Sequence, residues 1–163
     1  MAYNQMEMLE AEEDTQQGKY LTFAIGEEEY GLDIGQVTEI IGIQPVTALP
    51  EMPGYVKGVV NLRGKVFPVI DMRLRFNKPQ REYDERTCII VVDIQGVTMG
   101  LIVDRVLEVI KLDDADIAPP PDARTGILNR YLKGIGKSGE GVKLLIDAQT
   151  LFVEEELDRI SQC

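Results

Sequence analysis

Acidic side chains are the commonest groups in this chain that could carry out acid–base chemistry, and some of them lie close together in the sequence. Asp113, Asp114 and Asp116 follow an apolar strand pattern, and Glu154 to Glu156 lie near the end of the chain. Paired carboxylates can act as general acid and base when their surroundings push their pKa values apart. The first cluster falls in a polar loop and the second on a helix face, so solvated surface charge is the better interpretation of both.

Other kinds of catalytic or metal site find little support. The chain has no histidine, which removes the commonest general base, the commonest metal ligand and the phosphoacceptor of a histidine kinase. Cys88 and Cys163 are too few for a disulfide framework or a four-ligand zinc site. The glycine-rich run from Gly134 to Gly141 is not followed by a lysine and a serine or threonine that open a helix, as a phosphate-binding loop would be. We therefore expect a protein that is not an enzyme and needs no cofactor or metal.

Composition and charge restrict the partners. The 163 residues are 44% hydrophobic and 28% charged, which is typical of a globular protein, and the formal net charge is −11. Such a charge disfavours nucleic acid and anionic membrane surfaces. No apolar run reaches the roughly 20 residues of a membrane span, and the start lacks the blocks of a signal peptide. We expect a cytoplasmic protein, with residues 1–18, which carry five acids and no base, as a flexible tail.

Short strands fill most of the remaining chain. Residues alternate between apolar and polar from Lys19 onward, and glycine-containing turns separate apolar or β-branched runs. Two proline-containing segments, at 44–54 and 119–122, must be loops because proline cannot donate to a strand ladder. The strands are expected at 19–25, 29–32, 37–43, 56–62, 66–70, 87–94, 97–103 and 106–111.

An internal repeat accounts for this arrangement. A shift of 69 positions aligns Tyr30–Ile41 with Met99–Ile110 at five identities, and a shift of 76 aligns Tyr55–Phe76 with Tyr131–Phe152 at seven. About five short strands in each half are enough for a small closed barrel. We predict a mainly β fold of two five-stranded barrels, with lobes at about 19–80 and 81–147. A helix is predicted at about 148–160, with Asp147 as its N-cap and a stripe of Val153, Leu157 and Ile160.

The two halves differ at one hairpin tip. The first half has Asn61-Leu62-Arg63-Gly64 between apolar strands, with Gly64 available for a positive φ angle, whereas the second half has Lys137-Ser138-Gly139-Glu140 at the equivalent positions. An ordinary soluble turn would also explain the first tip. The core positions repeat while the tip diverges, which favours a binding role for the first tip.

These residues resemble the CheW family of bacterial chemotaxis coupling proteins. The similarity covers Glu29–Ile34, Val37, Glu39, Gly58, Asn61–Gly64 and Pro68–Arg73, and it runs from about Lys19 to Ile160, within a CheW-like domain of residues 19–163. It implies two intertwined SH3-like barrels in an adaptor that joins the cytoplasmic helical tips of chemoreceptors to the regulatory domain of the histidine kinase CheA in membrane-associated arrays. The family's receptor groove, between the barrels, would include Val37, Glu39, Gly58, Asn61, Arg63, Gly64, Gly100 and Val103. Its kinase surface would include Ile117, Pro119 and Asp122.

Three other functions compete with that of the coupling protein. One is a CheW-like regulatory module of another kinase-controlled pathway, such as twitching motility. Another is the regulatory module of a kinase or of an adaptor with a receiver domain, for which the chain has no second domain. A small-molecule-binding barrel or hydrolase would need a polar pocket with a base, and the missing histidine counts against it.

Overall fold

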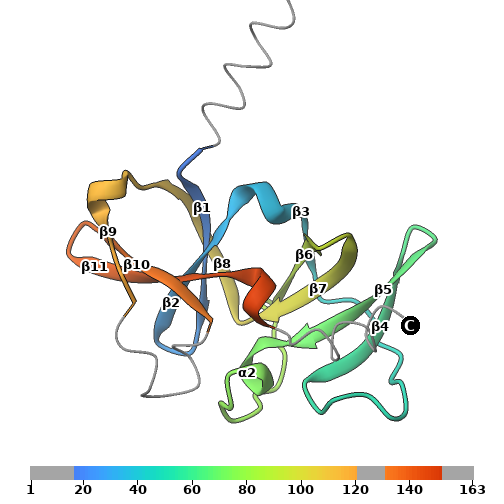
Figure 1. Cartoon of the computed structure of the whole chain (residues 1–163). Helices are drawn as coiled ribbons and strands as arrows, with labels where there is room; N and C mark the ends of the chain where they lie inside the picture. Colours follow the sequence, from blue (N-terminus) through green and yellow to red (C-terminus); the bar gives the residue numbers. More distant parts are fainter. Residues whose placement is uncertain (1–16, 121–130, 152–163) are drawn as a thin grey trace, which may run out of the picture.

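The computed structural model describes residues 17–120 and 131–151, and it consists mainly of strands (Figure 1). Three short 3₁₀ helices, at Ile34–Gln36 (η1), Asp114–Asp116 (η2) and Ala148–Leu151 (η4), and one α-helical turn, α2 (Met72–Arg75), connect them. The strands are β1 (Lys19–Ile25), β2 (Glu28–Asp33), β3 (Val37–Gly42), β4 (Val56–Leu62), β5 (Lys65–Asp71), β6 (Cys88–Ile94), β7 (Val97–Val103), β8 (Arg105–Lys111), β9 (Ile117–Ala118), β10 (Leu132–Ser138) and β11 (Gly141–Ile146).

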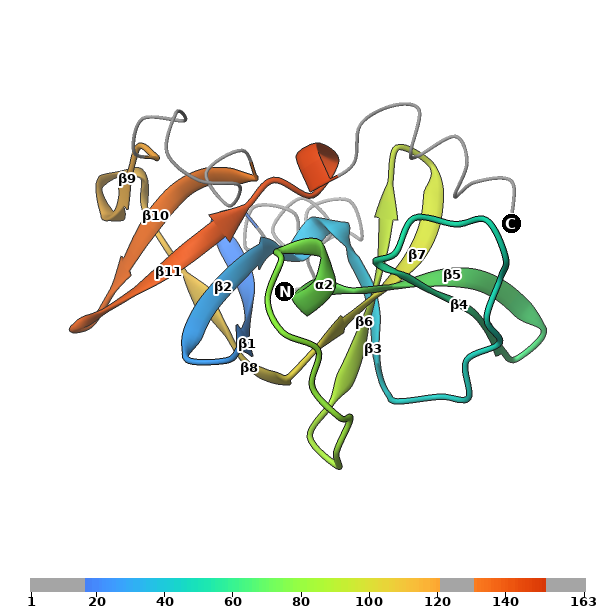
Figure 2. The ribbon, with the colours of Figure 1, turned by 90° about the horizontal axis from the view of Figure 1, so that it is seen from below.

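Two sheets of the same design lie side by side (Figure 2). Sheet A has the order β8-β1-β2-β11-β10-β9, and sheet B has the order β3-β6-β7-β5-β4. In each sheet the chain that leaves one edge strand returns to the opposite edge. In sheet A it returns as β9 beside β10, and in sheet B Thr47 bridges to Val59 on β4. This return joins the two edges, which is how small barrels avoid exposed strand edges.

The strands of the two halves are exchanged between the barrels. Strands β1 and β2 belong to the first half of the chain but pair with β8 and β11, while β6 and β7 pair with β3 and β5. The barrels are therefore intertwined, as the family resemblance implied. The lobes expected at 19–80 and 81–147 describe the repeat in the sequence and need correction as structural units. Sheet A takes its strands from 19–33 and 105–146, and sheet B from 37–103.

The repeat is visible in the register of the strands. The parallel pair of β11 and β2 places Leu145 opposite Gly31, and the parallel pair of β5 and β7 places Val69 opposite Gly100. These two pairs are equivalent under the shifts of 76 and 69 positions found in the sequence. Each barrel is thus built on one plan from two different parts of the chain.

A shared core holds the barrels together. Buried side chains from both sheets form one cluster, which includes Phe23, Tyr30, Phe76 and Tyr131. Neighbouring rings in this series have centroids 5.6, 5.4 and 5.7 Å apart, within the usual range for aromatic pairs. The Arg75 guanidinium lies 4.4 Å from the ring centroid of Tyr55 and 5.1 Å from that of Tyr131. Because the core belongs to both sheets, neither barrel is expected to fold well alone.

Short helices follow the equivalent aspartates of the two halves. Asp71 accepts hydrogen bonds from the Arg73 and Leu74 amides at the start of α2, a turn that the sequence analysis did not predict. Asp147 accepts from the Gln149 amide at the start of η4, as expected of an N-cap. The described part of the predicted helix at 148–160 is the 3₁₀ turn Ala148–Leu151, and its remainder lies outside the described residues. The predicted tail, up to residue 16, also lies outside them.

The helices among the described residues are all short. In the described part of the chain, none has the length and apolar character needed to cross a bilayer.

Candidate functional site

The tip of the β4–β5 hairpin is a tight, well-defined turn. Leu62 pairs with Lys65, and the two residues between them, Arg63 and Gly64, have φ angles of 52° and 87°. Two positive φ angles define a type I′ turn, whose twist matches that of the flanking strands. The Asn61 side-chain oxygen accepts a hydrogen bond of 3.0 Å from the Gly64 amide and so fixes the turn further. Local geometry therefore holds the predicted binding tip.

The equivalent tip in the other barrel has a different turn. Ser138 pairs with Gly141, and Gly139 has a φ of 62°, while Glu140 is not among the residues with positive φ. A single positive angle at the first central position is typical of a type II′ turn. The divergence seen in the sequence thus changes the backbone as well as the side chains.

An ion pair joins the first tip to strand β3. The Nη2 atom of Arg63 donates to both carboxylate oxygens of Glu39, at 2.6 and 2.8 Å. The Arg63 side chain is 70% exposed and that of Glu39 is 34% exposed. Pairs this exposed stabilise a fold by about 0 to 1 kcal/mol. The pair therefore adds little to folding, and both groups remain accessible to a partner.

A shallow hollow lies beside this ion pair. Its lining comes from the five strands of sheet B and from the tip of the β4–β5 hairpin. The lining combines charged, polar and apolar residues: Thr38, Glu39, Leu62, Arg63, Lys65, Phe67, Val91, Asp93 and Thr98. Nearby on the same hairpin, the Val66 side chain is 54% exposed. Apolar contact area with charges at its border suits an amphipathic partner. Of these lining residues, the sequence analysis named Glu39 and Arg63 as binding residues and Leu62 as part of the tip. The others could have been found only from the pairing of the strands.

Four of the eight predicted receptor residues are buried or pack against the shared core. Val103 is 2% exposed within the shared core, and Val37 packs against the same core. Gly100 is buried, and a Cβ there would lie 2.6 Å from Ile89 and 2.9 Å from Val69. Gly58 is also buried, with a φ of 146°, and a Cβ there would collide with the backbone oxygen of Thr47.

The structure thus divides the predicted receptor residues into two groups. Glu39, Asn61, Arg63 and Gly64 lie together on the surface of sheet B. Val37, Gly58, Gly100 and Val103 contribute packing and close backbone approach. The hollow itself belongs to sheet B and is lined by no residue of sheet A, whereas the resemblance had implied a groove between the barrels.

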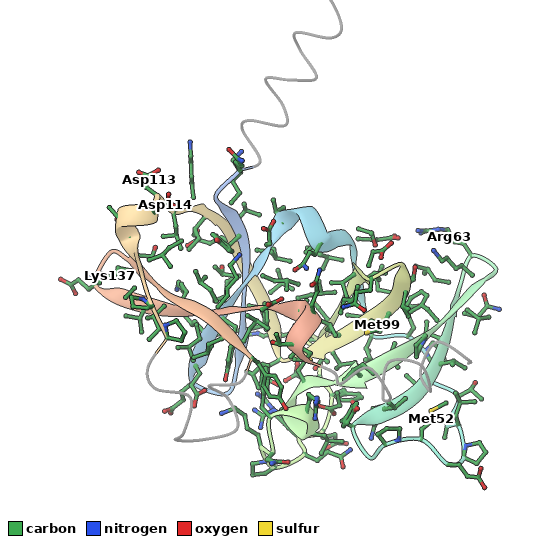
Figure 3. The ribbon with its side chains drawn as sticks, in the orientation of Figure 1. Met52, Arg63, Met99, Asp113, Asp114 and Lys137 are labelled. Atoms are coloured by element: carbon green, nitrogen blue, oxygen red, sulfur yellow. The ribbon has the colours of Figure 1, made fainter. Side chains whose placement is uncertain are left out.

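The predicted kinase residues lie on the other barrel. Ile117 is in β9 and packs against the cluster of Tyr20, Leu112 and Leu145 inside sheet A. Pro119 follows it and is exposed, and Asp122 lies outside the described residues. Asp113 and Asp114, just before β9, are at the opposite end of the molecule from Arg63 (Figure 3). The two predicted surfaces are therefore well separated.

A charged network ties the barrels together where the chain crosses between them. Asp104, the single residue between β7 and β8, accepts from Arg73 Nε at 2.8 Å, from Arg73 Nη2 at 2.6 Å and from the Gly26 amide at 2.7 Å. Burial alone would raise the pKa of Asp104, but the hydrogen bonds and charge of Arg73, with the Gly26 amide, lower it below its usual value. This network joins α2 to the β1–β2 turn, and no motif in the sequence pointed to it.

Carboxylate and thiol groups do not gather into a metal site in the described chain. In residues 17–120 and 131–151, no three or more cysteine, aspartate or glutamate side chains are placed to bind a metal ion.

Comparisons with known proteins agree on one family. The model of the CheW-like domain matches residues 19–156. The chain is 39% identical to the chemotaxis protein CheW of Klebsiella aerogenes over 139 residues, which cover 85% of this chain and 84% of that protein. It is 31% identical to CheW of Treponema pallidum over 150 residues, covering 90% and 88%. The crystal structure of the scaffolding protein TtCheW from Thermoanaerobacter tengcongensis superposes with a TM-score of 0.78 at 39% identity, covering 85% of this chain and 94% of that one.

Proposed function

This chain belongs to the CheW-like family of chemotaxis proteins, and on that premise we propose that it joins the cytoplasmic tips of chemoreceptors to the histidine kinase CheA without catalysing a reaction. The family membership supports a role as a chemotaxis scaffold. The particular partners, and recruitment of the protein to receptor arrays from the cytoplasm, form the proposal.

One observation carries the receptor part of the proposal. The Arg63–Glu39 ion pair lies at a fixed type I′ tip, beside the hollow that contains Leu62, Phe67 and Val91. An amphipathic helix could place apolar side chains in this hollow and polar side chains against the ion pair. Because the turn is already in its final conformation, binding would require little ordering of the tip.

The kinase part of the proposal rests on the separation of the two surfaces. Ile117 lies in β9 of sheet A and Pro119 comes directly after that strand, while Glu39 and Arg63 lie on β3 and the β4–β5 tip of sheet B. The shared core and the Asp104–Arg73 network connect the two barrels. A body built in this way can hold two partners at once and raise the effective concentration of one near the other.

Two charge reversals test the proposal. Arg63→Asp should weaken binding to a receptor-tip fragment and leave binding to full-length CheA unchanged, whereas Asp122→Arg should do the reverse. In a ternary assembly the two effects should add to within about 0.5 kcal/mol, because sites that share no partner rarely couple more strongly.

The measurements are titration calorimetry with each partner and a reconstituted kinase autophosphorylation assay. Receptor-dependent kinase activity should fall in both variants, and the activity of the kinase without receptor should be the same with either. The proposal that separate surfaces bind the receptor and the kinase is wrong if each variant, while still folded, loses both interactions equally.

A further inference from the structure

A second hollow, outside the site described above, gathers arginine side chains on a protein whose net charge is −11. It lies where the β1–β2 turn meets the segment between α2 and β6 and the start of β8. Its lining consists of Gly26, Arg81, Asp84, Arg86, Asp104 and Arg105. No motif in the sequence pointed to a function for any of these residues.

Both carboxylates of the hollow already have donors. Asp104 receives two hydrogen bonds from Arg73 and one from the Gly26 amide, and Arg81 Nη1 lies 3.5 Å from it. Asp84 accepts from Arg81 Nη2 at 3.0 Å and from the Arg86 amide at 2.8 Å. Their charges are therefore matched by Arg73 and Arg81. Glu85 lines the adjoining hollow with Arg81, Asp84 and Arg86, and it does not line this one.

Two guanidinium groups remain without a carboxylate. Among the described residues, the side chains of Arg86 and Arg105 make no ion pair, and both residues are exposed. Their backbones are nevertheless fixed. The Arg86 amide donates to Asp84, and Arg105 pairs with Ala24 in the β1–β8 ladder. Two guanidinium groups without a carboxylate partner thus line one hollow, and hydrogen bonds fix the backbone that carries them.

From this arrangement we propose that the hollow binds an oxyanion, and specifically a phosphate dianion. Guanidinium groups present paired donors that match the oxygens of phosphate, and two such groups balance two negative charges. The net charge of −11 disfavours an extended polyanion, because each further anionic group would be repelled by the rest of the surface. A single compact dianion gains the local contacts with the least long-range repulsion.

The phosphate could be free inorganic phosphate or a phosphate ester carried by a larger molecule, since both present the same oxygens. The proposal does not depend on the receptor or kinase interactions, because the hollow shares no residue with the tip of sheet B or with Ile117 and Pro119.

The test is a titration of the full chain, labelled with ¹⁵N, with sodium phosphate near neutral pH and low ionic strength. A parallel titration with sodium chloride at equal ionic strength corrects for screening. We expect saturable shifts of the Gly26, Arg86 and Arg105 amide signals with phosphate and not with chloride. The double variant Arg86→Gln/Arg105→Gln should weaken the affinity about tenfold or more, as expected for the loss of charge-assisted hydrogen bonds.

A matched control removes two positive charges elsewhere. The double variant Lys65→Gln/Lys137→Gln makes the same change in net charge, with one lysine on β5 and the other on β10. It should leave the phosphate affinity within about twofold of the original, because charges far from the hollow are screened. Equal weakening in both double variants, or shifts that chloride reproduces, would overturn the proposal. Unchanged signals from the shared core show that each variant is folded.

O-phosphoserine and acetate separate the possible sources. Tighter binding of O-phosphoserine than of phosphate would support a phosphate ester as the ligand, and weaker binding would support free phosphate. Acetate that saturates the same signals at the same concentration as phosphate would overturn the assignment to a dianion.

Discussion

Exchanging the charges of Arg63 and Glu39 would distinguish a residue that touches the receptor from one that only holds the hairpin tip. In Arg63→Asp the ion pair is lost and two carboxylates face each other across a surface where the original side chains are 70% and 34% exposed. The free energy of unfolding should fall by less than about 1 kcal/mol, because exposed pairs contribute little and water screens the repulsion. Receptor-tip affinity should fall by about 1 to 3 kcal/mol, the usual loss for a charge-assisted contact at an interface.

The double variant Glu39→Arg/Arg63→Asp restores a pair of opposite charges in the reverse order. If Arg63 contacts the receptor directly, the double variant should regain the stability that Arg63→Asp lost and should still bind weakly. Lys137→Asp is the matched control, because Lys137 lies on the equivalent strand of the other barrel, far from this tip (Figure 3). It makes the same change in net charge and should leave receptor affinity unchanged.

Calorimetric titration with a receptor-tip fragment and urea unfolding would provide both numbers for each variant. Recovery of binding in the double variant would refute a direct contact and would show that the pair acts by fixing the tip. A loss of several kcal/mol of stability in Arg63→Asp would refute the estimate that the pair contributes little to folding.

Two further predictions concern the fold beneath the site. Gly58→Ala should destabilise the protein by about 2 to 4 kcal/mol in thermal or urea unfolding, because the φ of Gly58 is 146° and a Cβ there would meet the backbone oxygen of Thr47. Gly42→Ala is the control, and it should change the free energy of unfolding little because a Cβ at Gly42 has open space around it. The pKa of Asp104 is lower in the folded protein than in the unfolded chain. Its ionised carboxylate therefore stabilises the fold above the unfolded pKa, and this stabilisation is lost as the pH falls through the folded pKa. Asp104→Asn should therefore reduce stability at neutral pH, and the difference from the original protein should shrink toward acid pH. If the difference in the free energy of unfolding stayed constant from neutral to acid pH, the lowered pKa of Asp104 would be contradicted.

Strand positions and turns could be predicted from the sequence because they depend on neighbouring residues. Alternation of apolar side chains located β1, and the shifts of 69 and 76 positions showed that the two halves share one plan. The Arg63-Gly64 turn has the positive φ at Gly64 that the sequence suggested. The lack of histidine and the small number of cysteines argued against catalysis from composition alone.

The exchange of strands between barrels was decided by tertiary structure. Both halves carry the same apolar pattern, so β2 could by pattern alone have paired with β5 or with its equivalent, β11. The chain crosses from β2 to β3 through Ile34–Gln36, and from β7 to β8 through Asp104. Neither connection forms a hairpin, because β2 and β8 belong to sheet A whereas β3 and β7 belong to sheet B.

Burial likewise separated the residues of the candidate site. In the sequence Gly58, Gly100 and Val103 were assigned by resemblance alone, whereas the divergence of the two hairpin tips also favoured Asn61 and Arg63. The packed structure places the first three where neighbouring atoms leave no room for a partner, and the last two on an exposed tip. The hollow around Asp84 and Asp104 is lined by residues from segments that are far apart in the sequence, such as Gly26, Arg81 and Arg105. Local pattern determines which residues form a strand or a turn, whereas contacts between distant segments determine which side chains share a surface.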